Sequence, residues 1–409
     1  MKVLHLVAGE LTGGASRGAY WLHKALMKTG VDSYVLTNGK GNNGDASVSV
    51  LMKTPYDKIR FGVQSRLGNL PVHFYRNRQE NIFNTGFGGI EVTRHPLYQT
   101  ADIVHLHWIN GLLSMQGLRK IKKPAVWTMR DMWPLTGGCH YSMDCDRYKI
   151  GCGKCPQLGS SSSADLSRAV VRYKQRLVPA SIELVGISHW MSECAKASEV
   201  FRDYSIRTIS NNIDTTEFLP VDRKIARDLL SLSNGKKIVL VGANNVTDFY
   251  KGFSLFQESL KHLDCKNIQF LFFGRGSNEA LDQLGVEYTN LGLLTDTLSL
   301  RVAYSAADVF VAPSRMDAFG KTLAESMSCG TPVICFDATG PKDIVEHQRT
   351  GYKAIPFDSQ DLAKGIDWVL GLPIDEYNTV CCQARARAIS QFDSMVIAQQ
   401  YKELYESII

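Results

Sequence analysis

Residues 308–340 read DVFVAPSRMDAFGKTLAESMSCGTPVICFDATG, and this stretch decides the fold. The apolar run 309–312 predicts a buried strand, a helix is expected over 320–330, and a second strand over 332–336. A strand, a polar loop and a helix N-terminus together form the usual phosphate or sugar site of α/β proteins. Free backbone N–H groups and the positive end of the helix dipole face the ligand there. The stretch therefore predicts an α/β protein with a ligand site at this helix start.

Five residues around that helix start are candidate ligand contacts. Lys321, Thr322 and Glu325 fall within two turns of the helix N-terminus, on nearly one face. Glu325 offers two acceptor oxygens to a vicinal diol, and Asp317 can reach another hydroxyl of the same ligand. Gly320 stands at the turn, where backbone N–H groups would meet a phosphate. The alternative is a capped core helix whose glutamate is merely solvated.

The frame D-x-F-G-x-x-x-x-E-x-M-x-x-G-x-P-V, which begins at Asp317, resembles the E-x7-E element of the family-four (group 1) retaining glycosyltransferases. The resemblance implies the GT-B fold, in which two Rossmann-like domains face a cleft that holds a sugar nucleotide. It also implies that Glu325 binds the ribose hydroxyls and that Asp317 contacts the transferred sugar. Asp317 stands where the family has its first Glu, so this carboxylate is shorter by one methylene.

The length and composition of the chain agree with a two-domain globular protein. A chain of 409 residues exceeds one ordinary core, and 44% hydrophobic content indicates a globular chain. The net charge of +6 is compatible with nucleotide diphosphates or anionic lipid as ligands. A strand is expected from Lys2, without a signal peptide, and no apolar run reaches the roughly 18 residues of a membrane span. We therefore expect a cytoplasmic protein, with peripheral contact to the inner face of the plasma membrane as an option.

A glycine-rich turn, GELTGGASRG at 9–18, separates a first strand over 3–7 from a helix over 19–27. Gly13 and Gly14 would let the backbone approach a phosphate, and the following helix offers N–H groups. The turn is not G-x-G-x-x-G, and no acid follows the second strand to hold a nicotinamide-cofactor ribose, which argues against a dehydrogenase. It resembles the G-G-A loop that approaches the donor diphosphate and the acceptor in the family; a plain turn is the alternative.

Residues 53–80 are expected to be less regular, with basic and aromatic side chains interleaved. Such a segment can lie on an anionic membrane surface. Transferases similar to this chain elongate lipid-linked glycans, so a membrane role is open. An ordinary, partly helical insertion is slightly favoured. No recognisable nucleic-acid-binding module appears, and no nucleic-acid partner is expected.

Polar residues end two strands of the first domain. His105 and His107 share one face of a strand; they could bind a metal ion, but one core histidine and one histidine near the ligand are favoured. Arg130 and Asp131 follow a strand predicted over 125–129. Arg130 stands where the family often carries a His, and arginine cannot act as a base, so it could pair with an acidic acceptor or the diphosphate. Asp131 is then the candidate that orients the acceptor hydroxyl; an Arg–Asp pair that braces the loop is the alternative.

Four of the ten cysteines fall within residues 139–155, CHYSMDCDRYKIGCGKC. Thiolates at these spacings can close a tetrahedral zinc site that would hold a helix-poor loop together, with His140 as a substitute ligand. A redox-active pair and reduced free thiols are the alternatives. The loop is expected to shape the acceptor side of the cleft. The candidate zinc ligands are Cys139, Cys145, Cys152 and Cys155.

The segment TISNNIDTTEF resembles the N-G-I/V-D-x-x-x-F signature that opens the second domain of the family. We therefore predict an N-terminal, acceptor-side Rossmann-like domain over 1–205 and a sugar-nucleotide-binding domain over 206–390. The last helix, within 391–409, resembles the GT-B tail that crosses back onto the first domain.

In the family, the loop that corresponds to GANNVTDFYKG carries an Arg and a Lys that clamp the donor diphosphate. Lys251 matches the lysine. Asn244 or Asn245 stands at the arginine position, so Arg275 or Arg17 is the candidate for the missing charge. A lone surface lysine is the alternative for Lys251.

The predicted function is a retaining glycosyltransferase that moves a sugar from a UDP- or GDP-linked donor to a glycan or lipid-linked glycan in surface-polysaccharide synthesis. As the resemblance implies, Lys251, the glycines and the helix start stabilise charge on the leaving diphosphate, so no catalytic divalent metal is expected. Asp317 would position the donor sugar without attacking it. Two alternatives stay open: a nucleotide-sugar 2-epimerase of the same fold, and a catalytically inactive, zinc-stabilised sugar-nucleotide-binding protein.

Overall fold

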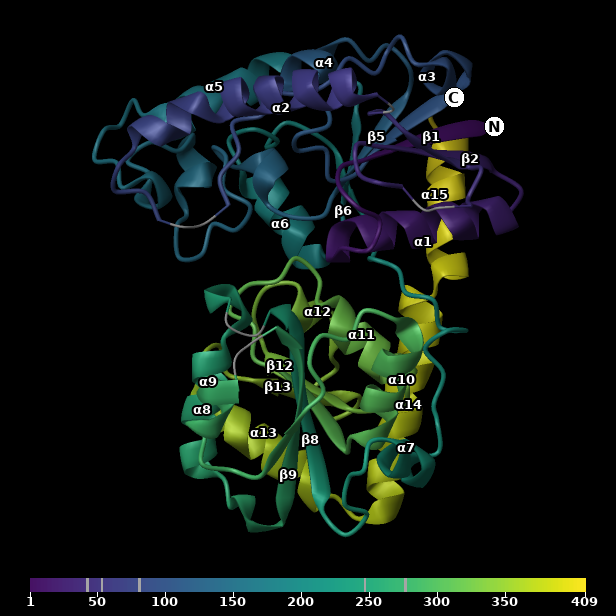
Figure 1. Cartoon of the computed structure of the whole chain (residues 1–409), viewed down its shortest axis with the longest axis vertical. Helices are drawn as coiled ribbons and strands as arrows, with labels where there is room; N and C mark the ends of the chain where they lie inside the picture. Colours follow the sequence, from purple (N-terminus) through teal and green to yellow (C-terminus); the bar gives the residue numbers. More distant parts are fainter. Residues whose placement is uncertain (42–43, 53, 80–81, 246–247, 276–277) are drawn as a thin grey trace. The chain divides into compact units, whose positions relative to one another are not determined.

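The computed structural model describes residues 1–41, 44–52, 54–79, 82–245, 248–275 and 278–409. The chain forms two compact units (Figure 1). The first comprises Met1–Ser210 together with Ile397–Ile409, and the second comprises Asn211–Val396. Both units are α/β units built on a fully parallel sheet.

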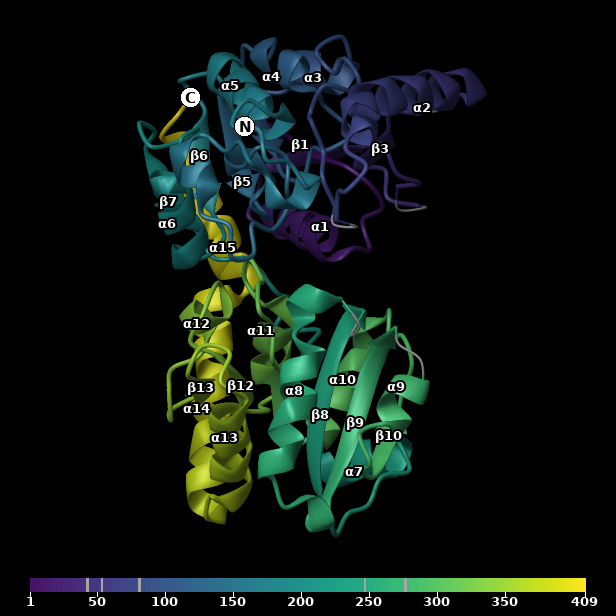
Figure 2. The same cartoon turned by 90° about the vertical axis from the view of Figure 1, so that its left-hand side faces the viewer.

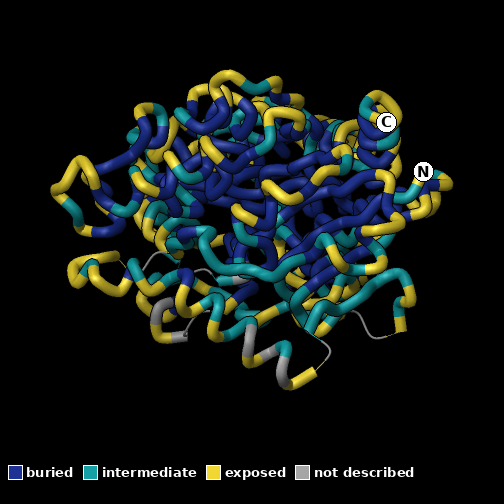
Figure 3. The backbone as a smooth tube through the Cα atoms, turned by 90° about the horizontal axis from the view of Figure 1, so that it is seen from above, coloured by how far each residue is buried: buried dark blue, intermediate teal, exposed yellow. Residues whose placement is uncertain are grey.

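The first unit contains a seven-stranded sheet in the order β3-β2-β1-β4-β5-β6-β7. Its strands are β1 (Lys2–Val7), β2 (Asp32–Thr37), β3 (Val48–Val50), β4 (Ile103–Leu106), β5 (Ala125–Met129), β6 (Glu183–Gly186) and β7 (Ile206–Thr208). Its helices are α1 (Gly14–Lys28), α2 (Pro55–Asn69), α3 (Pro96–Thr100), α4 (Met115–Arg119), α5 (Leu166–Leu177) and α6 (His189–Ala197). Every residue of β4 and β5 is buried, as expected for central strands covered on both faces. In Figure 3 the buried stretches of the chain lie mainly in the interior and the exposed residues mainly at the periphery.

The final helix, α15 (Ser394–Glu406), contributes to the core of the first unit from residue 397 onward. Tyr401 and Tyr405 are buried in the cluster that also contains Val3 and Ile103. Their hydroxyls are satisfied inside that core, because Tyr401 bonds the Thr128 hydroxyl at 2.7 Å and Tyr405 bonds a ring nitrogen of His105 at 2.6 Å. Buried tyrosines need such partners, so the pairing fixes the position of α15 on the sheet.

The second unit contains a six-stranded sheet in the order β10-β9-β8-β11-β12-β13. Its strands are β8 (Lys237–Asn245), β9 (Ile268–Arg275), β10 (Tyr288–Asn290), β11 (Val309–Ala312), β12 (Val333–Phe336) and β13 (Gly351–Ala354). Its helices are α7 (Arg223–Leu229), α8 (Phe253–Ser259), α9 (Asn278–Asp282), α10 (Thr297–Ala306), α11 (Lys321–Ser328), α12 (Pro341–Ile344), α13 (Ser359–Gly371) and α14 (Ile374–Phe392). The sequence runs outward from β8 in two directions, to β9 on one side and β11 on the other. This change of direction is where open parallel sheets bind ligands.

The segment for which a partly helical insertion was favoured contains a helix. Residues 55–69 form one continuous helix, α2, whose N-terminus is closed by a reciprocal capping box between Thr54 and Asp57. A short 3-10 turn, Leu70–Phe74, follows directly. The apolar side chains Ile59, Val63 and Leu67 of α2 are exposed, so the helix turns no apolar stripe toward the core. Among the described residues we find no helix with the length and hydropathy needed to span a bilayer.

Candidate active site

The candidate site of the second unit lies at the carboxyl ends of β8, β9 and β11. Asn245 ends β8 and is the register partner of Arg275, which ends β9 and is exposed. The Asn245 amide donates to Asp248 Oδ1 at 2.7 Å. The backbone of Asn244 belongs to β8, but its side chain lies outside the described part of the structure. The predicted donor-side residues Asn245 and Arg275 therefore share one edge of the sheet.

Lys251 and Asp317 meet directly at this edge. Lys251 Nζ donates to Asp317 Oδ2 at 2.7 Å, and both side chains remain partly accessible. The other carboxylate oxygen of Asp317 accepts from the backbone N–H groups of Phe319 at 3.3 Å and Gly320 at 3.2 Å. Asp317 thus holds the turn that starts α11 and also holds the lysine. A cation beside a helix N-terminus is suited to bind an anionic group.

Backbone packing explains why Lys251 reaches this turn. Gly252 has a left-handed φ of +69°, and a Cβ at this position would lie 1.9 Å from the carbonyl oxygen of Pro313. The carbonyl of Tyr250 accepts from the backbone N–H groups of Arg315 at 2.9 Å and Met316 at 3.2 Å. The turn around Lys251 is therefore locked onto the loop that follows β11, which only glycine at 252 permits.

Glu325 lies one turn inside α11 and is fully buried. The hydroxyl of Tyr304, from α10, donates to its Oε2 at 3.0 Å, and Lys321 Nζ lies 3.8 Å from its Oε1. Tyr304 carries no signal in the sequence that would have predicted this contact. A vicinal diol that binds Glu325 would therefore compete with Tyr304 and Lys321. Thr322 is half-buried, and Gly320 caps the helix in a left-handed conformation, φ +97°.

In the first unit, Gly13 and Gly14 lie where α1 begins. Gly13 is the extended N-cap residue, and Gly14 is the first helical residue. A Cβ on Gly14 would meet no atom within 4 Å, so open space adjoins this helix start. The Arg17 guanidinium lies over the ring of Trp21, from the same helix, at 5.1 Å.

Arg130 begins a series of hydrogen bonds through buried histidines of the central strands. Its Nε donates to His107 Nδ1 at 3.2 Å, so His107 Nε2 is left to bond His5 Nδ1 at 2.9 Å. Burial lowers the pKa of the Arg130 guanidinium to about 10, so it stays charged at neutral pH. Burial also lowers the pKa values of His5, His105 and His107 well below 6.5, so all three are neutral.

The same three histidines form the one group of His, Cys, Asp or Glu side chains in the described structure whose ligand atoms all lie within 4.8 Å of one another. His105 bonds the hydroxyls of Tyr405 and Thr128 through its two ring nitrogens. Because His107 also uses both nitrogens, the hydrogen bonds favour a core role over a metal site. His107 is buried as well, and the expected position of one histidine near the ligand stays a prediction.

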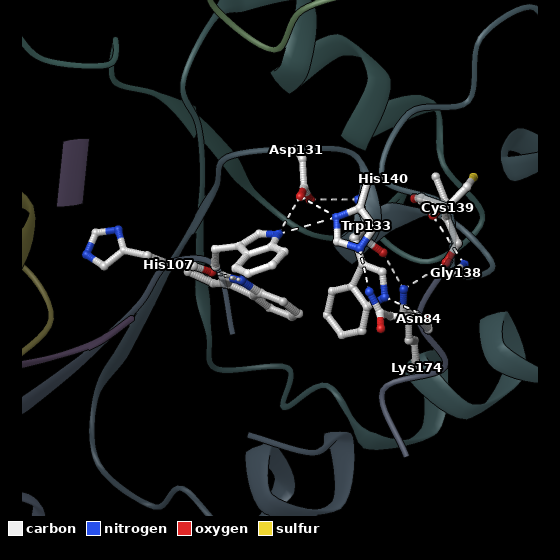
Figure 4. Close-up of polar contacts among 11 residues, drawn as sticks. Asn84, His107, Asp131, Trp133, Gly138, Cys139, His140 and Lys174 are labelled. Carbon is white, nitrogen blue, oxygen red and sulfur yellow. Dashed lines mark hydrogen bonds and ion pairs between the residues drawn. The ribbon is translucent and has the colours of Figure 1, made fainter. Parts of the chain in front are cut away.

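Asp131 is held by a second polar cluster, shown in Figure 4. Its Oδ2 accepts from His140 Nδ1 at 2.6 Å and from the Trp108 indole at 2.7 Å, and its Oδ1 accepts from the backbone N–H of Trp133 at 3.0 Å. The amide of Asn84 bonds His140 Nε2 at 2.9 Å, which fixes the proton on Nδ1. The cluster therefore presents a carboxylate that is already oriented by three donors.

His140 was a substitute zinc ligand in the sequence analysis, and that expectation is wrong because both of its ring nitrogens are engaged by Asp131 and Asn84. The intervening segment folds back on itself: the backbone N–H of Met132 donates to the His140 carbonyl at 3.0 Å. The Gly-Gly pair before Cys139 is the signal that could have suggested this reversal.

The four cysteines of the loop line one small cavity of about 20 Å³. Burial raises the pKa of the Cys152 thiol to about 12 and also raises that of the Cys155 thiol, and nearby backbone N–H groups act in the opposite direction at both sulfurs. Cys152 itself has a left-handed φ of +59°, between two glycines of the same conformation. The four thiols line the same cavity, but no three of their sulfur atoms all lie within 4.8 Å of one another, as the ring nitrogens of the three histidines do.

Comparison with known proteins identifies a group 1 glycosyltransferase domain within the chain and the fold of the whole chain. Residues 235–371 match the family model described as Glycosyl transferases group 1. A putative colanic acid biosynthesis glycosyl transferase, WcaC of Escherichia coli, is 27% identical over 374 residues, which cover 87% of each chain.

Two solved structures share the fold over nearly the whole chain. Sucrose-phosphate synthase from Thermosynechococcus elongatus is 20% identical, with a TM-score of 0.72 over 99% of this chain and 98% of that one. HepE of Anabaena, solved in complex with UDP and glucose, is 18% identical, with a TM-score of 0.66 over 100% of both chains.

Proposed function

This chain is a glycosyltransferase with a group 1 domain and the GT-B fold, and we propose that it transfers a sugar with retention of anomeric configuration. The donor would be a UDP- or GDP-linked sugar, and the acceptor a glycan or lipid-linked glycan of a cell-surface polysaccharide. The observation that carries the proposal is the contact of Lys251 with Asp317 at the start of α11, one turn from Glu325. HepE was solved in complex with UDP and glucose, which supports a nucleotide-linked donor. WcaC is described as a putative colanic acid biosynthesis glycosyl transferase, which supports a polysaccharide acceptor.

The second unit supplies the donor chemistry in this proposal. When a donor binds, its diphosphate takes the place of the Asp317 carboxylate beside Lys251, and the N–H groups at the start of α11 face the same charge. As the sugar leaves, negative charge grows on the diphosphate, and these fixed positive groups stabilise it. Asp317, released from the lysine, orients a hydroxyl of the donor sugar. Glu325 binds the ribose hydroxyls as Tyr304 gives way.

The bond changes balance without a protein nucleophile. The bond between the anomeric carbon and the diphosphate oxygen breaks, and the acceptor oxygen bonds the same carbon on the same face. The acceptor proton passes to the leaving diphosphate oxygen. Asp131 acts as a positioning residue on the acceptor side, because three donors already fix its carboxylate. Arg130, held by His107, would pair with an acidic group of the acceptor or with the diphosphate. We propose that the reaction takes place in the cytoplasm, with the nucleotide sugar as the donor substrate.

We also propose that Cys139, Cys145, Cys152 and Cys155 hold a structural zinc ion. Their common cavity supports a thiolate metal site. Zinc would require the sulfurs to draw closer together. It would supply no chemistry to the transfer, but would hold the loop that carries His140 to Asp131.

A product assay tests the transfer. The protein is incubated with UDP- and GDP-linked hexoses and a short polyprenyl-diphosphate-linked glycan, and both nucleoside diphosphate and glycan are measured. We expect release of one nucleoside diphosphate per sugar added, with an unchanged anomeric configuration by NMR. Isomerised donor without transfer would indicate an epimerase, and binding without turnover would indicate an inactive sugar-nucleotide-binding protein. Either result overturns the proposal.

A further inference from the structure

The guanidinium of Arg315 is a cation of the second unit to which the proposed transfer assigns no role. Arg315 follows β11, two residues before Asp317, and is partly buried. Its Nε is buried without a hydrogen-bond partner. Within the described ranges of the chain, its side chain makes no hydrogen bond and no ion pair. A buried donor without an acceptor is unfavourable, so this arrangement indicates that a ligand supplies the acceptor.

Two exposed phenylalanines flank this guanidinium. Arg315 Cζ lies over the Phe249 ring, 4.9 Å from its centroid, and over the Phe357 ring, 6.0 Å from its centroid. Phe249 is 67% exposed and Phe357 is 38% exposed. These contacts hold the guanidinium in place but give its N–H groups no acceptor. We call Phe249, Arg315 and Phe357 the arginine–phenylalanine cluster.

The cluster comes from three loops of the second unit. Phe249 begins the turn after β8, Arg315 follows β11, and Phe357 follows β13. Strand β13 is the edge strand opposite β10 (Figure 2). Because the sheet is parallel, all three loops lie at the carboxyl ends of their strands, where open α/β sheets bind ligands. Two of the loops also carry Lys251 and Asp317, so the cluster adjoins the proposed donor site.

The backbone at Phe357 has a left-handed φ of +62°. The backbone N–H of Asp358 donates to the Ile355 carbonyl at 3.1 Å, so Pro356 and Phe357 are the central residues of a turn. A positive φ at the second central position normally calls for glycine, and a bulky residue there is strained. The Phe357 ring packs against the buried ring of Phe336, with centroids 5.6 Å apart. A large, exposed ring kept at a glycine position indicates a role in binding.

The acids that lie nearest to the cluster in the sequence are engaged elsewhere. Asp317 pairs with Lys251 at 2.7 Å. Asp358 caps α13, where its side chain accepts from the backbone N–H groups of Gln360 and Asp361. The positive charge of Arg315 is therefore left for an anion from outside the chain.

The chemistry of the cluster selects among anions. A guanidinium binds a carboxylate through two parallel N–H bonds, and phenyl rings contact apolar surface. A sugar ring that bears a carboxylate offers both, since its faces carry C–H groups and its rim carries the acid. A diphosphate has no apolar face for the phenylalanines, and Lys251 with the start of α11 already meets it in the proposed donor site. A neutral sugar would leave the guanidinium without an acceptor.

We propose that the arginine–phenylalanine cluster binds an acidic sugar, with the carboxylate on Arg315 and the ring against the phenylalanines. The acidic sugar belongs either to the donor, as the unit that is transferred, or to the acceptor glycan; the two sources share this chemistry. The inference rests on the proposed function, because it specifies the substrate class of that transfer.

Calorimetry tests the inference without turnover, in two arms. The donor arm compares UDP-glucuronate with UDP-glucose and GDP-mannuronate with GDP-mannose. The acceptor arm compares a hyaluronan tetrasaccharide with its carboxyl-reduced form. In one arm we expect the acid to bind at least about tenfold more tightly than its neutral counterpart, and Arg315→Gln to abolish that preference. Phe249→Ala and Phe357→Gly should each weaken binding of the acid by about threefold or more.

Two controls separate the cluster from the diphosphate site and from general effects of charge. UDP and GDP alone should bind Arg315→Gln within about twofold of the wild type, because the diphosphate meets Lys251 instead. Arg349→Gln is the matched variant, since Arg349 belongs to the same unit and pairs with Glu346 at 3.0 Å; it should keep the preference for the acid. Circular dichroism and thermal melting confirm that each variant is folded, and glycine suits the backbone at position 357.

Three results would overturn the inference while leaving the transfer reaction intact. One is a wild type that binds no acid more tightly than its neutral counterpart, and another is an Arg315→Gln protein that keeps the preference. The third is an equal loss of UDP or GDP and of the acid in Arg315→Gln, which would assign the guanidinium to the diphosphate. A wild type that binds no nucleotide would instead count against the proposed function, and the tetrasaccharide arm would then decide the role of the cluster.

Discussion

Lys251 and Asp317 are 66 residues apart in the sequence, yet their side chains form an ion pair of 2.7 Å where α11 begins. The pair joins two loops that follow neighbouring parallel strands, β8 and β11. Its carboxylate also accepts two backbone N–H groups at the turn before α11. A donor diphosphate would meet this lysine and this helix start together, so the pair is the centre of the proposed donor site.

The first prediction concerns Lys251. Lys251→Ala should lower kcat/KM by about 100-fold or more, because it removes the positive charge that stabilises the leaving diphosphate. It should also weaken UDP or GDP binding, measured by calorimetry. Lys353→Ala is the control, since Lys353 pairs with Asp337 at 3.0 Å and is exposed to a similar degree. Equal activity losses in the two variants would contradict a specific role for Lys251.

The second prediction concerns the buried carboxylate of Glu325. Tyr304→Phe removes the hydroxyl that donates to Glu325, and hydrogen bonds to charged groups contribute about 1.5–3 kcal/mol. We expect a loss of that size in the free energy of unfolding, measured in urea. Tyr288→Phe should cost less than about 0.5 kcal/mol, because its partner Asp282 is exposed. A Tyr304→Phe protein as stable as the wild type would show that the contact is not made.

The third prediction concerns Asp131. Asp131→Asn should lower kcat by about 100-fold, since the amide keeps one acceptor oxygen where the carboxylate accepts hydrogen bonds at both. Nucleotide affinity should stay within about twofold, because Asp131 belongs to the first unit. Asp146→Asn, in an exposed pair with Lys149, is the control.

A positioning role for Asp131 requires that the loss be the same across the pH range. If the variant instead removed an ionisation from the pH–rate profile, Asp131 would be a general base and this assignment would be wrong.

The fourth prediction concerns stability in acid. Burial holds the pKa values of His5, His105 and His107 well below 6.5, so they stay neutral in the folded chain but take up protons when unfolded. The unfolded chain then binds more protons below pH 6.5, and stability falls as the pH drops. Each histidine contributes up to about 1.4 kcal/mol per pH unit.

Urea unfolding between pH 5 and pH 7.5 measures this slope by tryptophan fluorescence, because five of the six tryptophans belong to the first unit. His5→Leu should reduce the slope, and His262→Gln, at an exposed site, should leave it unchanged. An unchanged slope in His5→Leu would mean that this ring is protonated in the folded chain.

The fifth prediction concerns metal content. The purified chain should hold about one zinc ion by mass spectrometry, and Cys152→Ser/Cys155→Ser should hold little. Cys382→Ser, at an exposed cysteine outside the loop, should keep the metal. Removal of zinc by a chelator should lower the melting temperature of the wild type. A wild type without zinc, purified under reducing conditions with zinc supplied, would leave four free thiols.

The sequence predicted the architecture well because parallel strands and glycine-bounded helices leave strong local signals. The resemblance noted over residues 317–333 is confirmed by the family match over 235–371, and the likeness to solved structures confirms the GT-B fold. Strands 103–106 and 125–129 also appear where they were expected.

Contacts between distant residues could not be predicted in the same way. Lys251 and Asp317 were assigned separate roles, because nothing local shows that Gly252 packs against Pro313. His140 was named only as a substitute zinc ligand, and the fold of the loop shows that it faces Asp131. Residues 53–80 were interpreted as a partly helical insertion, and the structure places helix α2 there, but the bounds of the helix were not predicted.

A crystal structure of the chain with a bound nucleoside diphosphate is the most direct test of the donor site. The account predicts that the diphosphate contacts Lys251 and the first N–H groups of α11, and that Glu325 accepts hydrogen bonds from the pentose hydroxyls. A nucleotide bound away from α11, with the Lys251–Asp317 pair and the Tyr304–Glu325 contact intact, would contradict it.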